Sequence, residues 1–412
     1  MALARAVLSI VVWFTVIVRL HPGPIVDEVA HFAVAEQLTH GQWPWRGQIP
    51  MLPSAHLLIA AVFKITGPSL TAGRAVSAGL TICAILMFYS AVRIRHPEAA
   101  GWQTLLMAWN PLFVPYCVLI YTEPASMLAV VVGLCFHVRR KSFWAALALL
   151  AACLIRQSNI VWAALFVVWL MVEPHQPAGA TSRFAPQGRF QTTVRRWLAS
   201  AWPYLGLMAM FVAVLLLRPG LVLTPTSDNR AGFNPAQYYL FFFIIVVVLL
   251  PIWAEKLHRS WARVLAPKFA RAGACTGLVA VIGMLVMLYD NPHHWNACQE
   301  FLHNVFTVLL YKSVGVRYLV STLIVVAVIG LAMPARRPHQ QAMLITAWVF
   351  VLLFLAPHRL VDNRYYILPL LLINFFSKYE APQYRRLVLW QFTLAAAAAA
   401  YTVRYAGPES GL

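Results

Sequence analysis

Residues 142–172 read SFWAALALLAACLI-RQSN-IVWAALFVVWLMV, two apolar runs on either side of four polar residues at 156–159. A helix that crosses a bilayer needs about 20 mostly apolar residues, within a range of roughly 17–25. The two runs are short for that length, but similar runs follow one another along the whole chain. The stretch therefore predicts two short membrane helices with a polar segment between them.

The composition of the 412 residues supports this interpretation. Hydrophobic residues make up 61% of the chain and charged residues 11%, whereas a soluble globular protein is nearer half apolar and a quarter charged. These proportions exclude a cytosolic enzyme, a disordered regulator and a secreted disulfide-rich protein. We predict an all-α polytopic membrane protein that forms a single domain over 1–412.

About thirteen runs are predicted to span the membrane. The first resembles a signal peptide in length but lacks a small-residue cleavage site before His21, so we expect a retained helix. The stretch 50–66 is apolar but contains Pro53 and Lys64, and we expect it to lie at the interface. The predicted spans are 2–20, 74–92, 102–120, 124–138, 142–155, 157–173, 198–217, 237–254, 273–289, 316–333, 342–356, 365–377 and 387–402.

The charge distribution sets the predicted orientation. The chain carries 32 Lys and Arg against 13 acids, a net charge of +19, which in a soluble protein would suggest nucleic-acid binding. Here the bases lie in short loops, where they mark the cytoplasmic side. With the N-terminus inside, the inner side holds 20 of the 32 bases, including those of a basic cytoplasmic loop at 174–197. We therefore expect no nucleic-acid partner, and we expect a first outer loop at 21–73.

The sequence gives no sign of a metal or cofactor. The six cysteines are scattered, and no CxxC spacing is present. His293 and His294 are adjacent but lack a third ligand at a useful spacing. No glycine-rich phosphate loop is present either. We expect neither a metal site nor a bound cofactor.

The first polar cluster on the predicted outer side is Pro24-Ile-Val-Asp-Glu-Val-Ala-His31. In a helix that begins near Pro24, Asp27 and His31 share a face, and Glu28 points about 100° away. A carboxylate at the membrane–water boundary can take a proton from a hydroxyl group. The alternative is that the two acids only stabilise the N-terminus of a helix.

Two further polar positions interrupt the apolar runs. Glu123, before Pro124, is either a functional group at the membrane boundary or a cap of the following helix. Arg156 opens the segment Arg-Gln-Ser-Asn-Ile-Val-Trp162 and has no acid nearby in the sequence. Its guanidinium needs an anion, which is either a phosphate or a carboxylate such as Glu123.

Two outer loops complete the set. The segment 357–366 contains Arg359, Arg364 and Tyr365, and bases on this side run against the usual charge bias. They fit a clamp for a lipid phosphate, or a solvated loop. The segment 289–295 carries Asp290 and His293 among aromatic residues, which suits carbohydrate, although a turn at Asn291–Pro292 accounts for part of it.

Acids, arginines and aromatic residues thus gather on one side of a helix bundle. Such a set fits an enzyme that transfers a polar group carried on a lipid phosphate, because the reaction needs a base for the acceptor and cations for the departing phosphate.

Four motifs carry a resemblance to a known family. They are Asp27-Glu28-x-x-His31, Tyr121-Thr122-Glu123-x-x-Ser126, Arg156-Gln157-Ser158-Asn159-Ile160-x-Trp162 and Arg364-Tyr365-Tyr366-Ile367-Leu368-Pro369. In this order, over about 24–370, they resemble the dolichyl-phosphate-glucose α-1,2-glucosyltransferases. This family of the GT-C class adds the terminal glucose to the lipid-linked N-glycan precursor.

The resemblance implies a GT-C-type bundle in the endoplasmic reticulum membrane with a lumenal active site. It implies dolichyl phosphate β-glucose as donor, a dolichol-linked oligosaccharide as acceptor and inversion at the anomeric carbon. Asp27 would be the base, with Glu28 as a less favoured substitute. The substrate-binding residues would be His31, Glu123, Arg156, Gln157, Asn159, Trp162, Asp290, His293, Arg359, Arg364 and Tyr365.

The chain departs from the family pattern on the acceptor side. It has Trp43-Pro-Trp-Arg46 and Ile49-Pro-Met-Leu-Pro-Ser54 where the family has Trp-Asp-Pro and Thr-Thr-Pro-x-Gly. Three alternatives stay open: a GT-C transferase with another sugar or acceptor, a lipid or sugar transporter, and a structural membrane scaffold. The transporter is disfavoured because the acids lie near the ends of spans and no internal repeat is visible.

Overall fold

The computed structural model describes residues 1–25, 27–43, 52–172, 189–217, 232–264, 281–283, 286, 310, 312–332 and 338–405. The described residues form helices and no strands, which confirms the all-α prediction. The first half of the chain contains α1 (Ala2–Leu20), α2 (Glu28–Thr39), α3 (Ser54–Thr66), α4 (Leu70–Arg95), η1 (Pro97–Ala99), α5 (Ala100–Ala108), α6 (Thr122–Val138), α7 (Ser142–Ile155), η2 (Gln157–Asn159) and α8 (Ile160–Val172).

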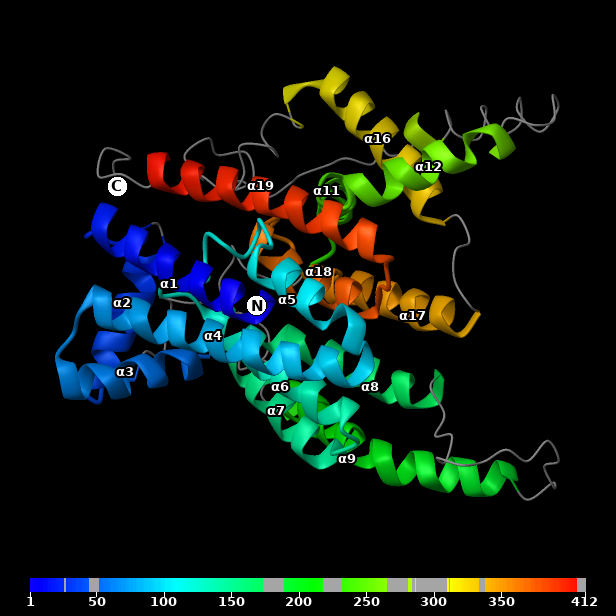
Figure 1. Ribbon diagram of the computed structural model, residues 1–412. Helices are drawn as coiled ribbons and strands as arrows, with labels where there is room; N and C mark the ends of the chain where they lie inside the picture. The colour runs from blue at the N-terminus through cyan, green and yellow to red at the C-terminus, as the bar shows by residue number, and fades with distance from the viewer. Residues whose placement is uncertain are drawn as a thin grey trace.

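The helices of the second half pack against those of the first. In Figure 1, α19 runs beside α5, and α17 lies against α8. This half contains α9 (Arg189–Leu217), α11 (Pro235–Val248), α12 (Leu250–Val264), α16 (Val314–Ala332), α17 (Pro338–Leu355), η4 (Asn363–Tyr366), α18 (Ile367–Phe376) and α19 (Ala381–Tyr405).

The lengths and composition of these helices are those of a multi-pass membrane protein. In the described part of the chain, four helices are long and apolar enough to cross a membrane, or five if the bent pair α11–α12 counts as one span. Six further apolar helices have 10–17 residues. The apolar segment predicted at the interface forms α3, a helix of 13 residues.

Two predicted spans are not continuous helices. The span expected at 102–120 is helical only to Ala108, because Pro111 and Pro115 cannot donate the backbone hydrogen bonds that a helix requires. The span expected at 237–254 bends by 74° between α11 and α12. Most of the span expected at 273–289, and 174–188 of the basic loop, lie outside the described residues, whereas 189–197 begin α9.

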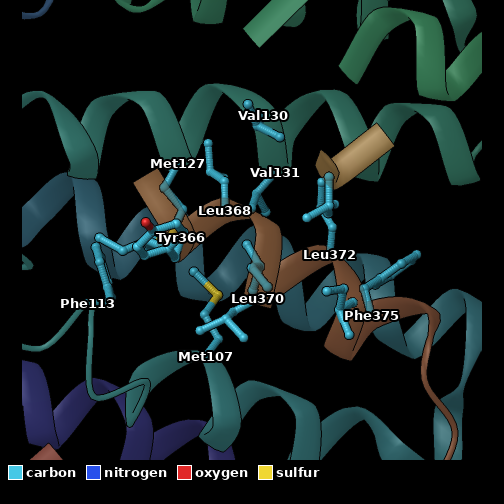
Figure 2. Close-up of a cluster of buried hydrophobic side chains, with 14 of the residues drawn as sticks. Met107, Phe113, Met127, Val130, Val131, Tyr366, Leu368, Leu370, Leu372 and Phe375 are labelled. Atoms are coloured by element: carbon cyan, nitrogen blue, oxygen red, sulfur yellow. The ribbon is translucent and has the colours of Figure 1, made fainter. Parts of the chain in front are cut away.

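The short helix α18 lies at the centre of the bundle. All ten of its residues are buried. Figure 2 shows Leu368, Leu370 and Leu372 of this helix among side chains from α5 and α6, with Tyr366 directly before it. A helix that is apolar on every side is stable only when other elements surround it completely. The bundle therefore fixes the position of the polar segment that precedes α18.

Helix α4 contains two glycines with different surroundings. A Cβ atom at Gly73 would lie 2.4 Å from Ile120 Cδ1, whereas a Cβ atom at Gly79 would meet nothing within 4 Å. The Ile120 side chain is fully buried against Phe63 and Ile59, so it has little room to move.

We expect Gly73→Ala to destabilise the protein by about 1–3 kcal/mol through overpacking. Gly79→Ala is the matched control, and it should be neutral or stabilising because alanine favours the helix. Thermal unfolding of the purified variants in one detergent measures both effects. Equal melting temperatures for Gly73→Ala and the parent protein would contradict the packing described for Ile120.

Candidate active site

A buried ion pair joins α2 to α4. Arg74 donates from Nε to Glu28 Oε1 at 2.9 Å and from Nη2 to Glu28 Oε2 at 2.6 Å, and both side chains are almost completely buried. Arg74 also donates to the carbonyl oxygens of His21 and Gly23. Charges in an apolar interior require such complete pairing, because an unpaired buried ion is very costly.

Glu28 is fully engaged in the structure. Its two carboxylate oxygens also accept hydrogen bonds from the backbone N–H groups of Ile25 and Ile120, each at 3.0 Å. The pair therefore ties the segment before α2 to α4 and to the segment that leads into α6. A proton-accepting role would require the loss of these bonds, so the geometry favours a supporting role for Glu28.

The preceding residue faces the other way. Asp27 precedes the first residue of α2, and its carboxylate is 32% exposed, the largest exposure among the acids of this region. Its backbone N–H donates to the Tyr121 hydroxyl at 3.2 Å. Its Oδ2 accepts from Arg364 Nη1 at 2.9 Å, and among the described residues Oδ1 has no hydrogen-bond partner. Arg364 thus fixes the orientation of the Asp27 carboxylate through Oδ2, and Oδ1 can accept a hydrogen bond from another group.

Arg364 joins the two halves of the chain. It lies in η4, directly before α18, and Asp362 caps this turn by accepting from the Arg364 backbone N–H at 2.9 Å. The guanidinium also donates from Nε to Asp362 Oδ2 at 2.6 Å and lies over the Tyr121 ring, 5.4 Å from its centroid. Arg364 is therefore held between Asp362 and Asp27, which are far apart in the sequence.

The ion pair considered between Glu123 and Arg156 is present. Arg156 donates from Nη2 to Glu123 Oε1 and from Nε to the Thr122 hydroxyl. Glu123 Oε1 also lies 4.0 Å from Arg364 Nε, and the Arg156 guanidinium lies 5.7 Å from the centroid of the Tyr365 ring. Three carboxylates and two arginines, from four parts of the chain, thus form one network, which we call the ion network: Asp27, Glu123, Arg156, Asp362 and Arg364.

His31 lies behind the ion network. Its Nδ1 is 2.8 Å from Nε2 of His56 in α3, and the two rings are stacked. Burial lowers the pKa of His31 well below its ordinary value, and it lowers the pKa of His56 to about 4. Both imidazoles are therefore neutral at physiological pH. The His31 ring also packs against the Tyr121 ring, whose hydroxyl accepts from the Asp27 backbone N–H. The histidine pair therefore supports Asp27 through Tyr121.

The other residues predicted around 156–162 lie inside the bundle. Asn159 is completely buried and donates to the Ser126 hydroxyl and the Ala152 carbonyl, each at 2.9 Å. Trp162 is also completely buried, and its indole donates to Asn159 Oδ1. Gln157 lies in η2, partly buried. These contacts connect α6, α7 and α8 and so hold Arg156 in place.

The predicted loop residues have separate positions. Tyr365 lies against Arg156, and its ring packs at a tilt against that of His358, with ring centroids 4.2 Å apart. Arg359 is partly buried, and its carbonyl oxygen accepts from Asn234, the cap of α11. No ion pair of Arg359 is found among the described residues. The predictions for Asp290 and His293 lie outside the described residues.

Three residues of the site were missed by sequence reasoning as functional residues: Arg74, Tyr121 and Asp362. Arg74 was the first residue of a predicted span, where a single arginine in an apolar run signals a buried partner. Its partner Glu28 is 46 positions away, so no local spacing links the two. Asp362 and Tyr121 belong to the quoted polar segments, but only the fold shows which groups they contact.

An apolar groove opens beside the ion network. It has a volume of about 300 Å³ and is lined mostly by aliphatic and aromatic side chains of the 111–121 segment, α11 and α19. Two further lining residues connect the groove to the ion network: Asn363 lies between Asp362 and Arg364, and the Tyr121 hydroxyl accepts from the Asp27 backbone N–H. The arrangement places charged groups and an apolar channel side by side. Among the described residues, no group of three or more His, Cys, Asp or Glu side chains could hold a metal ion.

The sequence pattern of the DIE2/ALG10 family matches residues 21–375, which include the whole ion network. The chain belongs to the DIE2/ALG10 family. This membership agrees with the resemblance drawn from the four motifs.

Relatives of this DIE2/ALG10 chain carry a shared name, Dol-P-Glc:Glc(2)Man(9)GlcNAc(2)-PP-Dol alpha-1,2-glucosyltransferase. The protein of Yarrowia lipolytica is 24% identical over 264 residues, 58% of this chain and 50% of the relative. That of Candida glabrata is 22% identical and covers 84% of this chain and 74% of the relative. The match thus spans about half the length of the first relative and three quarters of the second.

This family member is also similar to a solved structure. ArnT from Cupriavidus metallidurans bound to undecaprenyl phosphate is 15% identical, with a TM-score of 0.43 and coverage of 99% of this chain and 77% of that chain.

The Glu28–Arg74 pair gives a stability prediction for this DIE2/ALG10 chain. Arg74→Leu leaves the Glu28 carboxylate buried without a cation and should cost about 3–5 kcal/mol. The double variant Glu28→Leu with Arg74→Leu removes both charges and should recover part of this loss. Thermal unfolding of the two variants tests the prediction. If the double variant were less stable than Arg74→Leu alone, the unpaired Glu28 charge would not be the main cause of the loss of stability in Arg74→Leu.

Proposed function

We propose that this chain is an inverting glucosyltransferase of the endoplasmic reticulum membrane. The donor is dolichyl phosphate β-glucose, and the acceptor is the 2-hydroxyl of the terminal glucose on a dolichol-diphosphate-linked oligosaccharide. The site faces the lumen. The family membership and the shared name of the relatives support this substrate pair. The single observation that carries the chemistry is the position of Asp27, whose side chain is partly exposed and which Arg364 orients through Oδ2.

The reaction is a single displacement. Asp27 takes the proton of the acceptor hydroxyl, and the oxygen forms a bond to the anomeric carbon of the donor from the face opposite the phosphate. The bond between that carbon and the phosphate oxygen breaks, and its electron pair leaves with dolichyl phosphate. A β-linked donor gives an α-linked product. Phosphate is a good leaving group, so the reaction needs cations near it rather than a strong acid.

The ion network suggests how the donor is received. Three carboxylates face two guanidinium groups, so a donor phosphate must replace one of the carboxylates. Asp27 is more exposed than Glu123 or Asp362, and its contact with Arg364 is therefore the easiest to exchange with solvent. Binding of the phosphate to Arg364 would release Asp27 at the moment when the acceptor needs a base.

The apolar groove fits the other part of the donor. A polyprenyl chain is a long aliphatic ligand, and the groove offers aliphatic and aromatic walls that end beside Arg364. The phosphate would then meet the ion network while the chain lies between the 111–121 segment, α11 and α19.

The transfer assay tests the function and the base together. Purified protein in detergent receives radiolabelled dolichyl phosphate glucose or dolichyl phosphate mannose, with the diglucosylated lipid-linked oligosaccharide as acceptor. We expect transfer of glucose only. Asp27→Asn should abolish it without loss of folded protein, because the amide cannot accept the proton. Glu36→Gln is the matched control and should retain activity, because Glu36 is an acid of α2, the helix that Asp27 precedes, and lies outside the ion network.

Each outcome of this assay has a distinct meaning. Retained turnover in Asp27→Asn would remove Asp27 as the base. Transfer of mannose, or of neither sugar, would indicate a GT-C transferase with another substrate, as the altered segments around Trp43 and Ser54 allow.

A second variant tests the phosphate contact. Arg364→Lys retains the charge but loses the planar fork that binds phosphate and carboxylate with two hydrogen bonds. We expect the KM for dolichyl phosphate glucose to rise about tenfold or more, since one charge-assisted hydrogen bond is lost. The KM for the acceptor should change less. A change confined to the acceptor KM would contradict the assignment of Arg364 to the donor.

A further inference from the structure

Tyr121 contacts three parts of the candidate site. It directly precedes α6, its side chain is 4% exposed, and it is one of the aromatic residues that line the apolar groove. Its hydroxyl binds the backbone of Asp27, and its ring lies under the guanidinium of Arg364. One side chain is therefore in contact with the proposed base, with the proposed phosphate ligand and with the groove proposed for the lipid chain.

The Tyr121 hydroxyl holds the main chain at the start of α2. It accepts from the Asp27 backbone N–H at 3.2 Å and donates to the carbonyl oxygen of Ile25 at 3.5 Å. The first N–H groups of a helix have no partner within that helix, so this hydroxyl satisfies a donor that the backbone leaves free. The residue before it adds a second contact, because the Ile120 backbone N–H donates to Glu28 Oε1 at 3.0 Å. Two consecutive residues thus hold two consecutive acids.

The ring of Tyr121 makes a separate set of contacts. The Arg364 guanidinium lies 5.4 Å from its centroid, and the ring of His31 lies 5.2 Å from it at a tilt. A guanidinium within about 6 Å of an aromatic centroid is attracted to the face of the ring. The ring therefore holds Arg364 while the hydroxyl holds Asp27, and these two residues form the ion pair of 2.9 Å.

The Tyr121 hydroxyl gains importance once a donor is bound. Among the described residues, the Asp27 carboxylate has a single hydrogen-bond partner, Arg364. In the proposed mechanism the donor phosphate binds Arg364, and the carboxylate loses this partner. The Tyr121 hydroxyl is then the remaining side-chain group, in the described part of the chain, that holds Asp27 by a hydrogen bond. A reacting group that is misplaced by about 1 Å can slow a reaction about a hundredfold, so this contact acts on the reactive complex.

We propose that Tyr121 is a positioning residue of the transfer reaction, which keeps Asp27 in place after the donor phosphate has displaced it from Arg364. The Tyr121 ring also forms part of the groove wall, so the lipid chain of the donor packs against the residue that holds the base. Donor binding and alignment of the base are thereby linked through one side chain. The inference rests on the proposed function, because it requires a lipid phosphate at Arg364.

Steady-state kinetics of Tyr121→Phe test the role of the hydroxyl. This variant keeps the ring in the groove wall but removes the acceptor for the Asp27 N–H. We expect kcat to fall about tenfold or more, because the base is misplaced in the reactive complex. The KM for dolichyl phosphate glucose should be unchanged, because the contacts with the donor remain.

Two further variants separate positioning from folding. Tyr239→Phe is the matched control, because its buried hydroxyl also makes two hydrogen bonds, to Ser321 and to a backbone carbonyl of α16, and it lies outside the ion network and the groove. It should lose as much thermal stability as Tyr121→Phe and keep its kcat. Tyr121→Leu removes the ring as well, so it should also raise the donor KM about threefold or more.

Hydrogen–deuterium exchange tests the inference without transfer. The purified protein is compared with and without dolichyl phosphate, which can bind Arg364 but has no sugar to transfer. In the parent protein, the peptide that contains Asp27 should exchange at the same rate in both states, because the Tyr121 hydroxyl protects the backbone N–H. In Tyr121→Phe we expect faster exchange of this peptide and a further increase with the lipid. A purely structural role would give the same increase in both states.

The outcomes distinguish this inference from the proposed function. An unchanged kcat in Tyr121→Phe, when the parent protein transfers glucose, would overturn the positioning role alone. A change confined to the donor KM would overturn it too, and an unchanged donor KM in Tyr121→Leu would overturn the part assigned to the ring. If the parent protein transfers no glucose, the proposed function fails, and the exchange experiment still decides the inference: an increase that depends on the lipid supports it, and one that does not depend on the lipid overturns it.

Discussion

Two arginines buried in an apolar bundle must be paired with carboxylates, and this requirement determines the geometry of the site. Arg74 can be accommodated only with Glu28, and Arg364 only among Asp362, Asp27 and Glu123. The first pair fixes the segment before α2 against α4, and the second joins that segment to the far half of the chain. The result is that adjacent acids, Asp27 and Glu28, face opposite surroundings. One is sealed in the interior, and the other is left at the surface of a charged cluster.

Packing of apolar residues and pairing of charges depend on each other in this protein. Helix α18 is buried on all sides (Figure 2). Arg364 lies in the turn directly before it, so the position of the guanidinium is set by the central helix. Asn159 and Trp162 give Arg156 similar support from α8. The charged groups are therefore held by well-packed helices, as the proposed transfer reaction would require.

Much of this arrangement follows from the sequence alone. Long apolar runs predict the helices, and isolated charged residues between them predict where polar chemistry gathers, as with Asp27, Glu123, Arg156 and Arg364. The partnerships are harder to predict, since Glu28 and Arg74 are joined by the fold and not by a spacing along one helix. The positions at which helices end or bend are also only partly predictable from the sequence. Pro111, Pro115 and Pro251 are visible in the sequence, but the apolar runs around them predict continuous spans, and the 74° bend between α11 and α12 is seen only in the fold.

The central place of α18 has a consequence for the biogenesis of the protein. The ribosome synthesises α18 after α4, α5, α6 and α8, although these earlier helices pack against it in the finished bundle. The earlier helices must therefore remain loosely associated in the membrane until residues 367–376 emerge, and they can close only around that helix. Until then Asp27 and Glu123 have no Arg364 to meet, so the charged cluster assembles late, when α19 is the one described helix still to be synthesised.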